Sequence, residues 1–112
     1  MPPGERRKEH RYVVDAVQIA FGQKRFPVID IAVSGVRVAC APHEFEALKS
    51  QPCRLEFSFE DSIQVFAIEP RLIRSTNLCV AIGYTAPIAD WEAFIREFDT
   101  FRVRELDDQL FD

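Results

Sequence analysis

Apolar and polar side chains alternate without interruption from Cys53 to Glu60, in the sequence CRLEFSFE. Side chains two residues apart share one face of a β-strand, so the pattern predicts a strand with one apolar and one polar face. Strands of this kind are typical of antiparallel sheets that pack one face on a core. The segment therefore favours an antiparallel, β-dominated fold.

Short turns divide most of the chain into further segments of this kind. Pro70 should interrupt one of them, because proline has no amide hydrogen to donate to a neighbouring strand. A helical turn fits between the third and fourth strands, over residues 42–51. Together with residues 53–60, the predicted strands cover residues 12–21, 25–31, 36–40, 63–74 and 78–84. Six short strands joined by hairpin-length loops predict a small antiparallel barrel or sandwich over residues 12–85.

The apolar period changes after Pro87, and an amphipathic helix is predicted over residues 88–104. Its apolar side chains recur at the spacing of one helical face and are Trp91, Phe94, Ile95 and Phe98. A helix with such a stripe should pack across the barrel. The expected fold is therefore all-β with one C-terminal α-helix.

The last residues break this pattern. Leu106 lies five residues after Phe101, about 140° around a helix, so a second apolar stripe is out of phase with the first. The acidic side chains from Glu105 onward would also oppose the dipole at a helix C-terminus. We therefore expect the helix to end or bend near Arg104. An acidic tail, residues 105–112, would then either offer apolar side chains to a partner or to a second copy of the chain, or be a frayed end without a role.

Length and composition predict one domain. The chain has 112 residues, 47% of them apolar, which suffices for a single core. No segment has the roughly 18 consecutive apolar residues of a membrane span, and the start lacks a signal peptide. Cys40, Cys53 and Cys79 are odd in number and widely spaced, which favours buried thiols over disulfides or zinc. We expect a cytoplasmic protein without membrane insertion, as a monomer or weak homodimer.

Positive charge is concentrated at the start of an acidic chain. The total charge is −4, yet residues 1–11 carry +2, from four cations and two glutamates, so the other 101 residues carry −6. An acidic body disfavours DNA and RNA, which require a basic surface. An RNA-binding small barrel is an alternative, but no aromatic stacking platform is obvious. We expect a flexible basic arm, residues 1–11, that suits a small, discrete anion.

The usual catalytic constellations are missing from the sequence. The sequence places no acidic or nucleophilic partner beside His10 or His43. The pair His43-Glu44 begins like a zinc-protease motif but lacks the second histidine, and no glycine-rich phosphate loop is present. We therefore expect a protein that is not an enzyme and has no catalytic residues, metal site or cofactor.

The segment DIAVSG, residues 30–35, lies where two predicted strands meet. A glycine there permits a positive φ angle and lets a ligand approach the backbone closely. The Asp30 carboxylate can accept the paired N1–H and N2–H donors of a guanine, and arginine forks match guanine O6/N7 or phosphate oxygens. The residues alone leave two interpretations open: a guanine-nucleotide site, or a hairpin turn beside an unrelated tail.

Two motifs resemble those of the PilZ family. The segment Arg7-Lys8-Glu9-His10-Arg11 matches the family's RxxxR motif, and about twenty residues later DIAVSG resembles its (D/N)xSxxG motif. The flanking segments ERRKEHRYVV, VIDIAVSGVRV and VAIGY are similar as well. The likeness runs from residue 5 to about residue 104, and the two motifs in this order and spacing make it specific.

This resemblance implies a six-stranded antiparallel β-barrel with a C-terminal helix, and a bacterial receptor for cyclic di-GMP. The arginines of the arm would hold guanine edges and phosphates, Asp30 would read a guanine, and Gly35 would keep the turn open. The signal would pass to an unidentified downstream protein. The residues implied at the ligand are Arg6, Arg7, Arg11, Asp30, Ala32, Val33, Ser34 and Gly35.

One position departs from the family pattern. Ala32 stands where the family has serine, and Ser34 follows two residues later, on the same face of a strand. The loss of one hydroxyl contact costs roughly 0.5–1.5 kcal/mol, or about two- to tenfold in affinity. The departure keeps open a second interpretation, an adaptor of the same fold that binds a protein partner without nucleotide.

Overall fold

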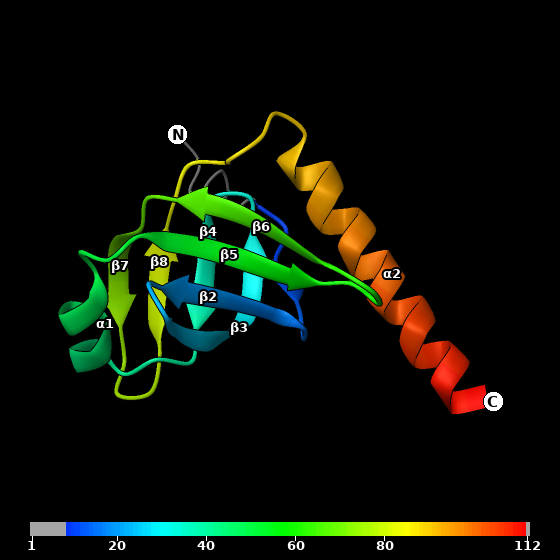
Figure 1. Cartoon of the computed structure of the whole chain (residues 1–112), viewed down its shortest axis with the longest axis horizontal. Coiled ribbons are helices and arrows are strands. Elements are labelled where there is room, and N and C mark those ends of the chain that lie inside the picture. The colour runs from blue at the N-terminus through cyan, green and yellow to red at the C-terminus, as the bar shows by residue number, and fades with distance from the viewer. Residues whose placement is uncertain (1–8, 112) are drawn as a thin grey trace, which may run out of the picture.

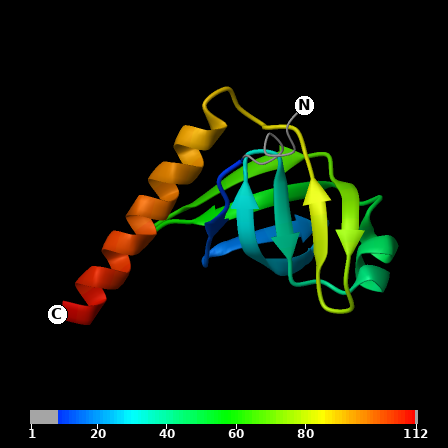
Figure 2. The ribbon, with the colours of Figure 1, turned by 180° about the vertical axis from the view of Figure 1, so that it is seen from behind.

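The described residues fold into one antiparallel sheet, with two helices at opposite ends of it (Figure 1 and Figure 2). The computed structural model describes residues 9–111, and their side chains up to residue 103. In chain order the elements are β1 (Tyr12–Val13), β2 (Val17–Phe21), β3 (Lys24–Ala32), β4 (Gly35–Val38), α1 (Pro42–Leu48), β5 (Cys53–Ser58), β6 (Ile63–Ile68), β7 (Arg71–Ser75), β8 (Val80–Gly83) and α2 (Trp91–Phe111).

The described sheet has eight strands, so the expected number of six is wrong. Two of the predicted strands are each divided. The first is interrupted at Ala16, whose φ angle of 60° leaves the β region. As a result, β1 and β2 pair with different parts of β3. The other is interrupted at Pro70, as expected, which separates β6 from β7.

The sheet is open, so the expected closed barrel is also wrong. Its strand order is β6-β5-β2-β3-β4-β8-β7, which puts β6 and β7 at the two edges, and no ladder joins these edges within the described residues. Glu69 and Pro70 connect the two strands and carry the chain from one edge to the other. Because this connection turns a corner and does not reverse the chain, β6 and β7 do not form a hairpin. The confirmed fold is a β-dominated antiparallel sheet with a C-terminal helix.

The alternating residues of β5 lie as predicted on their apolar face. Cys53, Leu55 and Phe57 are buried in a core to which most strands and both helices contribute. The polar face has an exception, since Glu56 is only 7% exposed. Its carboxylate accepts hydrogen bonds from Arg25, whose Nε lies 2.8 Å away, and from Arg54, whose Nε lies 3.0 Å away. The buried charge is therefore compensated by two arginines at the sheet surface.

The three cysteines are free, and two of them are buried as predicted. Burial raises the pKa of Cys40 to about 11 and that of Cys53 to about 12. Both thiols therefore stay protonated near neutral pH, which makes them poor nucleophiles. Cys79 is only partly buried, and its Sγ lies 3.5 Å from the hydroxyl oxygen of Thr76.

Helix α2 packs on the β5–β6 hairpin through an aromatic cluster. The ring centroid of Phe57 lies 5.6 Å from that of Trp91 and 4.9 Å from that of Phe94, and both pairs have the edge-to-face geometry that aromatic rings favour. Trp91 and Phe98 are buried, in agreement with the predicted stripe. Neither helix, over the residues described, has the length and apolar character that a membrane crossing requires.

The bounds of α2 differ from the predicted 88–104. The helix begins at Trp91 and continues to Phe111, so the expected end or bend near Arg104 is wrong. The segment after Arg104 contains no glycine or proline and is rich in strong helix formers, which outweighs the small cost of acidic side chains near the C-terminus. Arg102 also holds the helix to the β1–β2 connection, with its Nε 3.0 Å from a carboxylate oxygen of Asp15. The side chains of residues 105–112, and hence their expected partner contacts, lie outside the described part.

A buried chain of hydrogen bonds joins α2 to the turn between β3 and β4. The Nε1–H of Trp91 donates to the hydroxyl oxygen of Tyr84 at 2.7 Å, and that hydroxyl donates to the carbonyl of Ala32, also at 2.7 Å. The amide of Tyr84 donates to the carbonyl of Ser34 at 3.1 Å. Burial raises the pKa of Tyr84, so its hydroxyl keeps its proton near neutral pH. One side chain thus fixes the turn relative to the helix.

The substitution Tyr84→Phe should destabilise the fold by about 1–3 kcal/mol, because it removes the acceptor of the buried Trp91 indole N–H and a donor to the buried Ala32 carbonyl. Equilibrium unfolding in urea measures the change. Tyr12→Phe is the matched control, since no hydrogen bond of that half-buried hydroxyl is present in the described structure, and it should change stability by less than about 0.5 kcal/mol. Equal effects of the two substitutions would contradict the assigned role of Tyr84.

Candidate functional site

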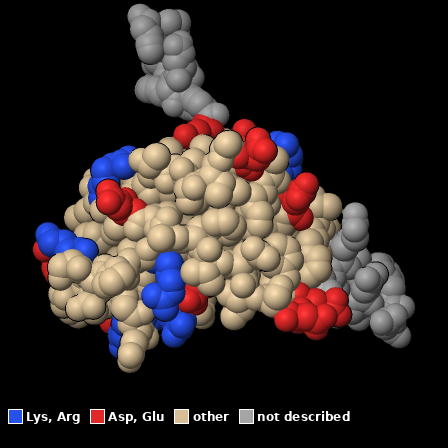
Figure 3. Space-filling view, turned by 45° about the horizontal axis from the view of Figure 1, so that its top comes forward, with Lys and Arg blue, Asp and Glu red and all other residues tan. Residues whose placement is uncertain are grey.

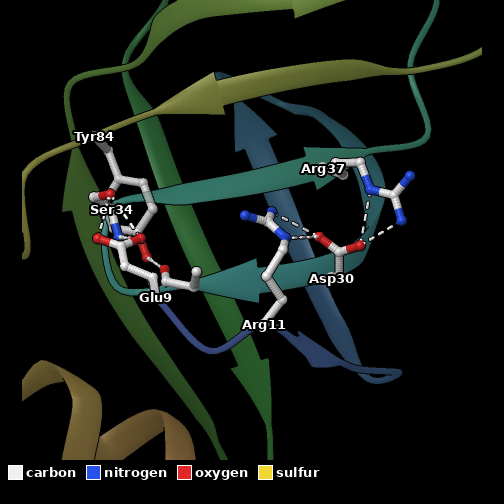
Figure 4. A network of polar contacts seen from close by, with 7 residues as sticks. Glu9, Arg11, Asp30, Ser34, Arg37 and Tyr84 are labelled. Carbon is white, nitrogen blue, oxygen red and sulfur yellow. Dashed lines mark hydrogen bonds and ion pairs between the residues drawn. The ribbon is translucent and has the colours of Figure 1, made fainter. Parts of the chain in front are cut away.

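The candidate site is built by the β3–β4 hairpin and by the segment that precedes β1. Val33 and Ser34 form a two-residue turn, so the ladder places Arg37 of β4 directly opposite Asp30 of β3. Strand β1 pairs with the other side of β3, with Val13 opposite Asp30. This pairing brings Arg11, just before β1, to Asp30 as well (Figure 4). The backbone alone thus directs two arginines to one carboxylate.

Asp30 accepts a fork of hydrogen bonds from each arginine. Arg11 donates to Oδ1 from Nε at 3.0 Å and from Nη2 at 2.7 Å. Arg37 donates to Oδ2 from Nε at 2.8 Å and from Nη2 at 2.5 Å. A carboxylate offers about four acceptor positions, so these four N–H groups occupy all of them. The Asp30 side chain is 5% exposed, whereas those of Arg11 and Arg37 are 45% and 48% exposed.

The pKa of Asp30 reflects two opposed effects. Burial by itself favours the neutral acid and raises the pKa, but the hydrogen bonds and charges of Arg37 and Arg11 outweigh it, so the pKa lies below its usual range. The hydrogen bond and the negative charge of Asp30 in turn raise the pKa of Arg37. Asp30 is therefore ionised near neutral pH and remains a strong acceptor.

A second contact joins the N-terminal segment to the turn. The hydroxyl of Ser34 lies 2.8 Å from Oε1 and 2.7 Å from Oε2 of Glu9, and the Ser34 amide donates to Oε1 at 3.3 Å. Both residues are exposed. Figure 4 shows Glu9 beside Ser34 and Tyr84, with the Asp30 cluster further along the same hairpin. Residues 9–11 therefore contact the hairpin at two places.

Among the residues predicted at the ligand, Arg11 pairs with Asp30, whereas Ser34 contacts Glu9 further along the hairpin, and Arg6 and Arg7 lie outside the described residues. Ala32 is fully buried, so its side chain is not accessible from outside. Val33 is half-buried at the turn.

The reason given for Gly35 is wrong in one respect. The positive φ angles among the described residues belong to Ala16 and Gly22, so Gly35 needs no left-handed conformation. A Cβ atom at Gly35 would lie 3.5 Å from the carbonyl oxygen of Ile82, an ordinary contact. A role for Gly35 in admitting a ligand stays a prediction.

Sequence reasoning missed Arg37, Glu9 and Tyr84. Arg37 carried a usable signal, because a two-residue turn at Val33 and Ser34 sets residue 37 opposite residue 30. Glu9 was counted only as a charge that offsets the basic run. Tyr84 carried no signal of its own, since its hydrogen bonds depend on how β8 and α2 pack.

Arg37 also lines a small pocket on the side away from Arg11. The pocket has a volume of about 160 Å³ and is lined by Arg37, Arg74, Ser75, Thr76, Cys79 and Ala81. Two guanidinium groups and two hydroxyls are donors that suit an anionic group. The cationic part of the candidate site thus extends from Arg11 across Arg37 towards β7.

The rest of the described surface gives weaker indications of a binding site. On the face in Figure 3, lysine and arginine side chains are scattered among carboxylates and wide uncharged areas, without a continuous basic surface among the described residues. The described side chains contain no group of three His, Cys, Asp or Glu residues that could hold a metal ion. Arginines also donate to the carboxylate of Glu56, so a carboxylate bound by arginines does not by itself indicate a ligand site. The Asp30 cluster differs because the Ser34 turn belongs to the same hairpin.

Comparison with known proteins adds no assignment. No protein-family model matches the chain, and no curated protein matches it significantly.

Stability should fall with acidification partly through Asp30. Its pKa in the folded state is below the unfolded value of about 3.9, so its contribution is present above that pH and is lost as the pH falls through the folded-state pKa. Asp30→Asn should lower the melting temperature at neutral pH and flatten its decline below about pH 4. Calorimetric melting from neutral pH to about pH 3 measures both. A decline as steep as that of the unmutated chain would contradict the role of Asp30, and Glu60→Gln, at an exposed carboxylate, serves as control.

Proposed function

We propose that the chain is a receptor for cyclic di-GMP that relays the signal to a downstream protein and is not an enzyme. The observation that supports this proposal best is the joining of the two sequence motifs. Arg11 of the first motif and Asp30 of the second are 19 residues apart and share two hydrogen bonds. Ser34 of the second motif contacts the same N-terminal segment. Described residues that the resemblance assigns to one ligand thus belong to one hairpin and to the segment that contacts it, which supports the proposal.

Ligand binding requires an exchange at Asp30. Guanine presents N1–H and N2–H donors, but the acceptor positions of Asp30 are occupied by two arginine forks. Arg11 is the partner that leaves in this proposal, because it precedes the short strand β1, whereas Arg37 sits in β4 between the ladders to β3 and β8. The released Arg11 then binds a phosphate or the O6/N7 edge of a guanine.

The relay uses the connection between the turn and α2. The ligand would contact the Ser34 turn, which Tyr84 joins to Trp91 at the start of α2. A shift of the turn would therefore alter the packing of the helix, and a partner that contacts α2 would sense it.

Arg11→Ala and Asp30→Ala should each weaken cyclic di-GMP binding by about 1.5–3 kcal/mol, the range for hydrogen bonds to charged groups. This corresponds to about ten- to a hundredfold in Kd. The same loss is expected for Arg7→Ala. Isothermal titration calorimetry measures the affinities, with GTP as the control nucleotide.

The matched control is Arg25→Ala. Arg25 donates a similar fork to the buried Glu56, with a side chain 46% exposed against 45% for Arg11. It should leave nucleotide binding unchanged. If the unmutated protein gives no heat with cyclic di-GMP at high micromolar concentration, the receptor proposal is wrong, and an adaptor without nucleotide takes its place.

A further inference from the structure

We propose that the amide and hydroxyl of Ser34 form a phosphate-binding subsite that the chain's own Glu9 carboxylate fills. The identity of the phosphate as that of a cyclic dinucleotide rests on the proposed function; the subsite itself rests on the geometry of the turn. A phosphate group would take the place of Glu9, in the same way that guanine would take the place of Arg11 on Asp30.

The contact of Glu9 has the geometry of anion binding. Two donors of one residue converge on one carboxylate, with the amide 3.3 Å from Oε1 and the hydroxyl 2.7 Å from Oε2. A backbone N–H and a serine hydroxyl are ordinary donors to phosphate oxygens. The amide of Tyr84 donates a hydrogen bond to the Ser34 carbonyl. This bond holds the turn in place whichever anion is bound.

The N-terminal segment matches the hairpin in charge at both contacts. It offers an anion, Glu9, to the donors of Ser34, and a cation, Arg11, to the carboxylate of Asp30. A guanine nucleotide has the same pattern, with phosphate oxygens as acceptors and the guanine edge as donor. Residues 9–11 therefore occupy the site as a substitute for the ligand, and the two contacts must be given up together when the ligand binds.

Opening the contact between Glu9 and Ser34 requires little free energy. Glu9 and Ser34 are both exposed, so each can be hydrated when the contact opens. Exposed ionic contacts contribute little to stability because water competes with them. A phosphate group at the donors of Ser34 can therefore displace Glu9. The apparent affinity for the ligand is nevertheless lower, because only molecules in which Glu9 has left Ser34 can bind it.

Glu9→Ala should tighten cyclic di-GMP binding about two- to fivefold, as expected for the removal of an exposed competitor. Ser34→Ala should weaken it about two- to tenfold. Titration calorimetry measures both, and Glu60→Ala, at an exposed carboxylate of the β5–β6 hairpin, should leave the affinity unchanged.

The double variant separates competition from simple charge repulsion. If Glu9 only repels the anionic ligand, the gain from Glu9→Ala should persist in a Ser34→Ala background. If Glu9 competes for the donors of Ser34, the gain should shrink there. Provided that cyclic di-GMP binds the unmutated protein, a gain of the same size in both backgrounds, or no gain in either, would overturn the proposal.

A titration with inorganic phosphate tests the subsite apart from the nucleotide. The NMR signal of the Ser34 amide should shift in a saturable way in the Glu9→Ala protein, and less in the unmutated one. If this shift appears but cyclic di-GMP does not bind, the subsite stands and the proposed function fails. If cyclic di-GMP binds but phosphate leaves the Ser34 amide unmoved, the proposed function stands and the subsite is wrong.

Discussion

The carboxylate of Asp30 is the group on which the arrangement of the candidate site depends. It is a nearly buried charge within a sheet, and a buried charge costs several kcal/mol unless it is paired and hydrogen-bonded. Two arginines meet this requirement, one from the neighbouring strand β4 and one from the segment before β1. Because one partner is supplied by the N-terminal segment, the need to compensate Asp30 also determines where that segment lies.

Burial is unequal within the Asp30 cluster, and this difference favours the replacement of one arginine by a ligand. The anion is covered while the guanidinium groups of Arg11 and Arg37 remain nearly half exposed. An arginine that leaves regains its hydration, whereas Asp30 must always have donors. A ligand with N–H groups can therefore replace one arginine without leaving the carboxylate unsolvated. At Glu56, Arg25 and Arg54 compensate a buried carboxylate in a similar way.

The sequence was informative about local structure and less so about how its parts meet. The alternation around Leu55 and the break at Pro70 are local, and both were predicted correctly. Ala16 gives no signal for a positive φ angle, because residues with a Cβ atom rarely adopt one, and its kink depends on the separate pairing of β1 and β2. The apolar stripe of α2 predicts which residues pack, but not how far a helix extends beyond its packed part.

The same distinction applies to the site. The resemblance assigned Arg11 and Asp30 to one ligand site; the two side chains form an ion pair, and ligand binding there stays a prediction. Arg37 required the register of the β3–β4 hairpin, which depends on a turn of two residues at Val33 and Ser34. The contact of Glu9 with Ser34 required the path of the N-terminal segment, which is set by tertiary pairing and not by any pattern along the chain.

The open sheet has a consequence for solubility. Strand β6 lies at an edge and contains no charged residue, and its Ile63 and Val65 are 58% and 50% exposed. Such an edge offers backbone donors and acceptors to another extended chain and invites aggregation. Helix α2 packs on this strand through Phe66, whose ring lies 4.9 Å from those of Trp91 and Phe94. The helix therefore covers the Phe66 side of an edge strand whose Ile63 and Val65 stay exposed, and a chain without α2 would add Phe66 to that exposed apolar surface.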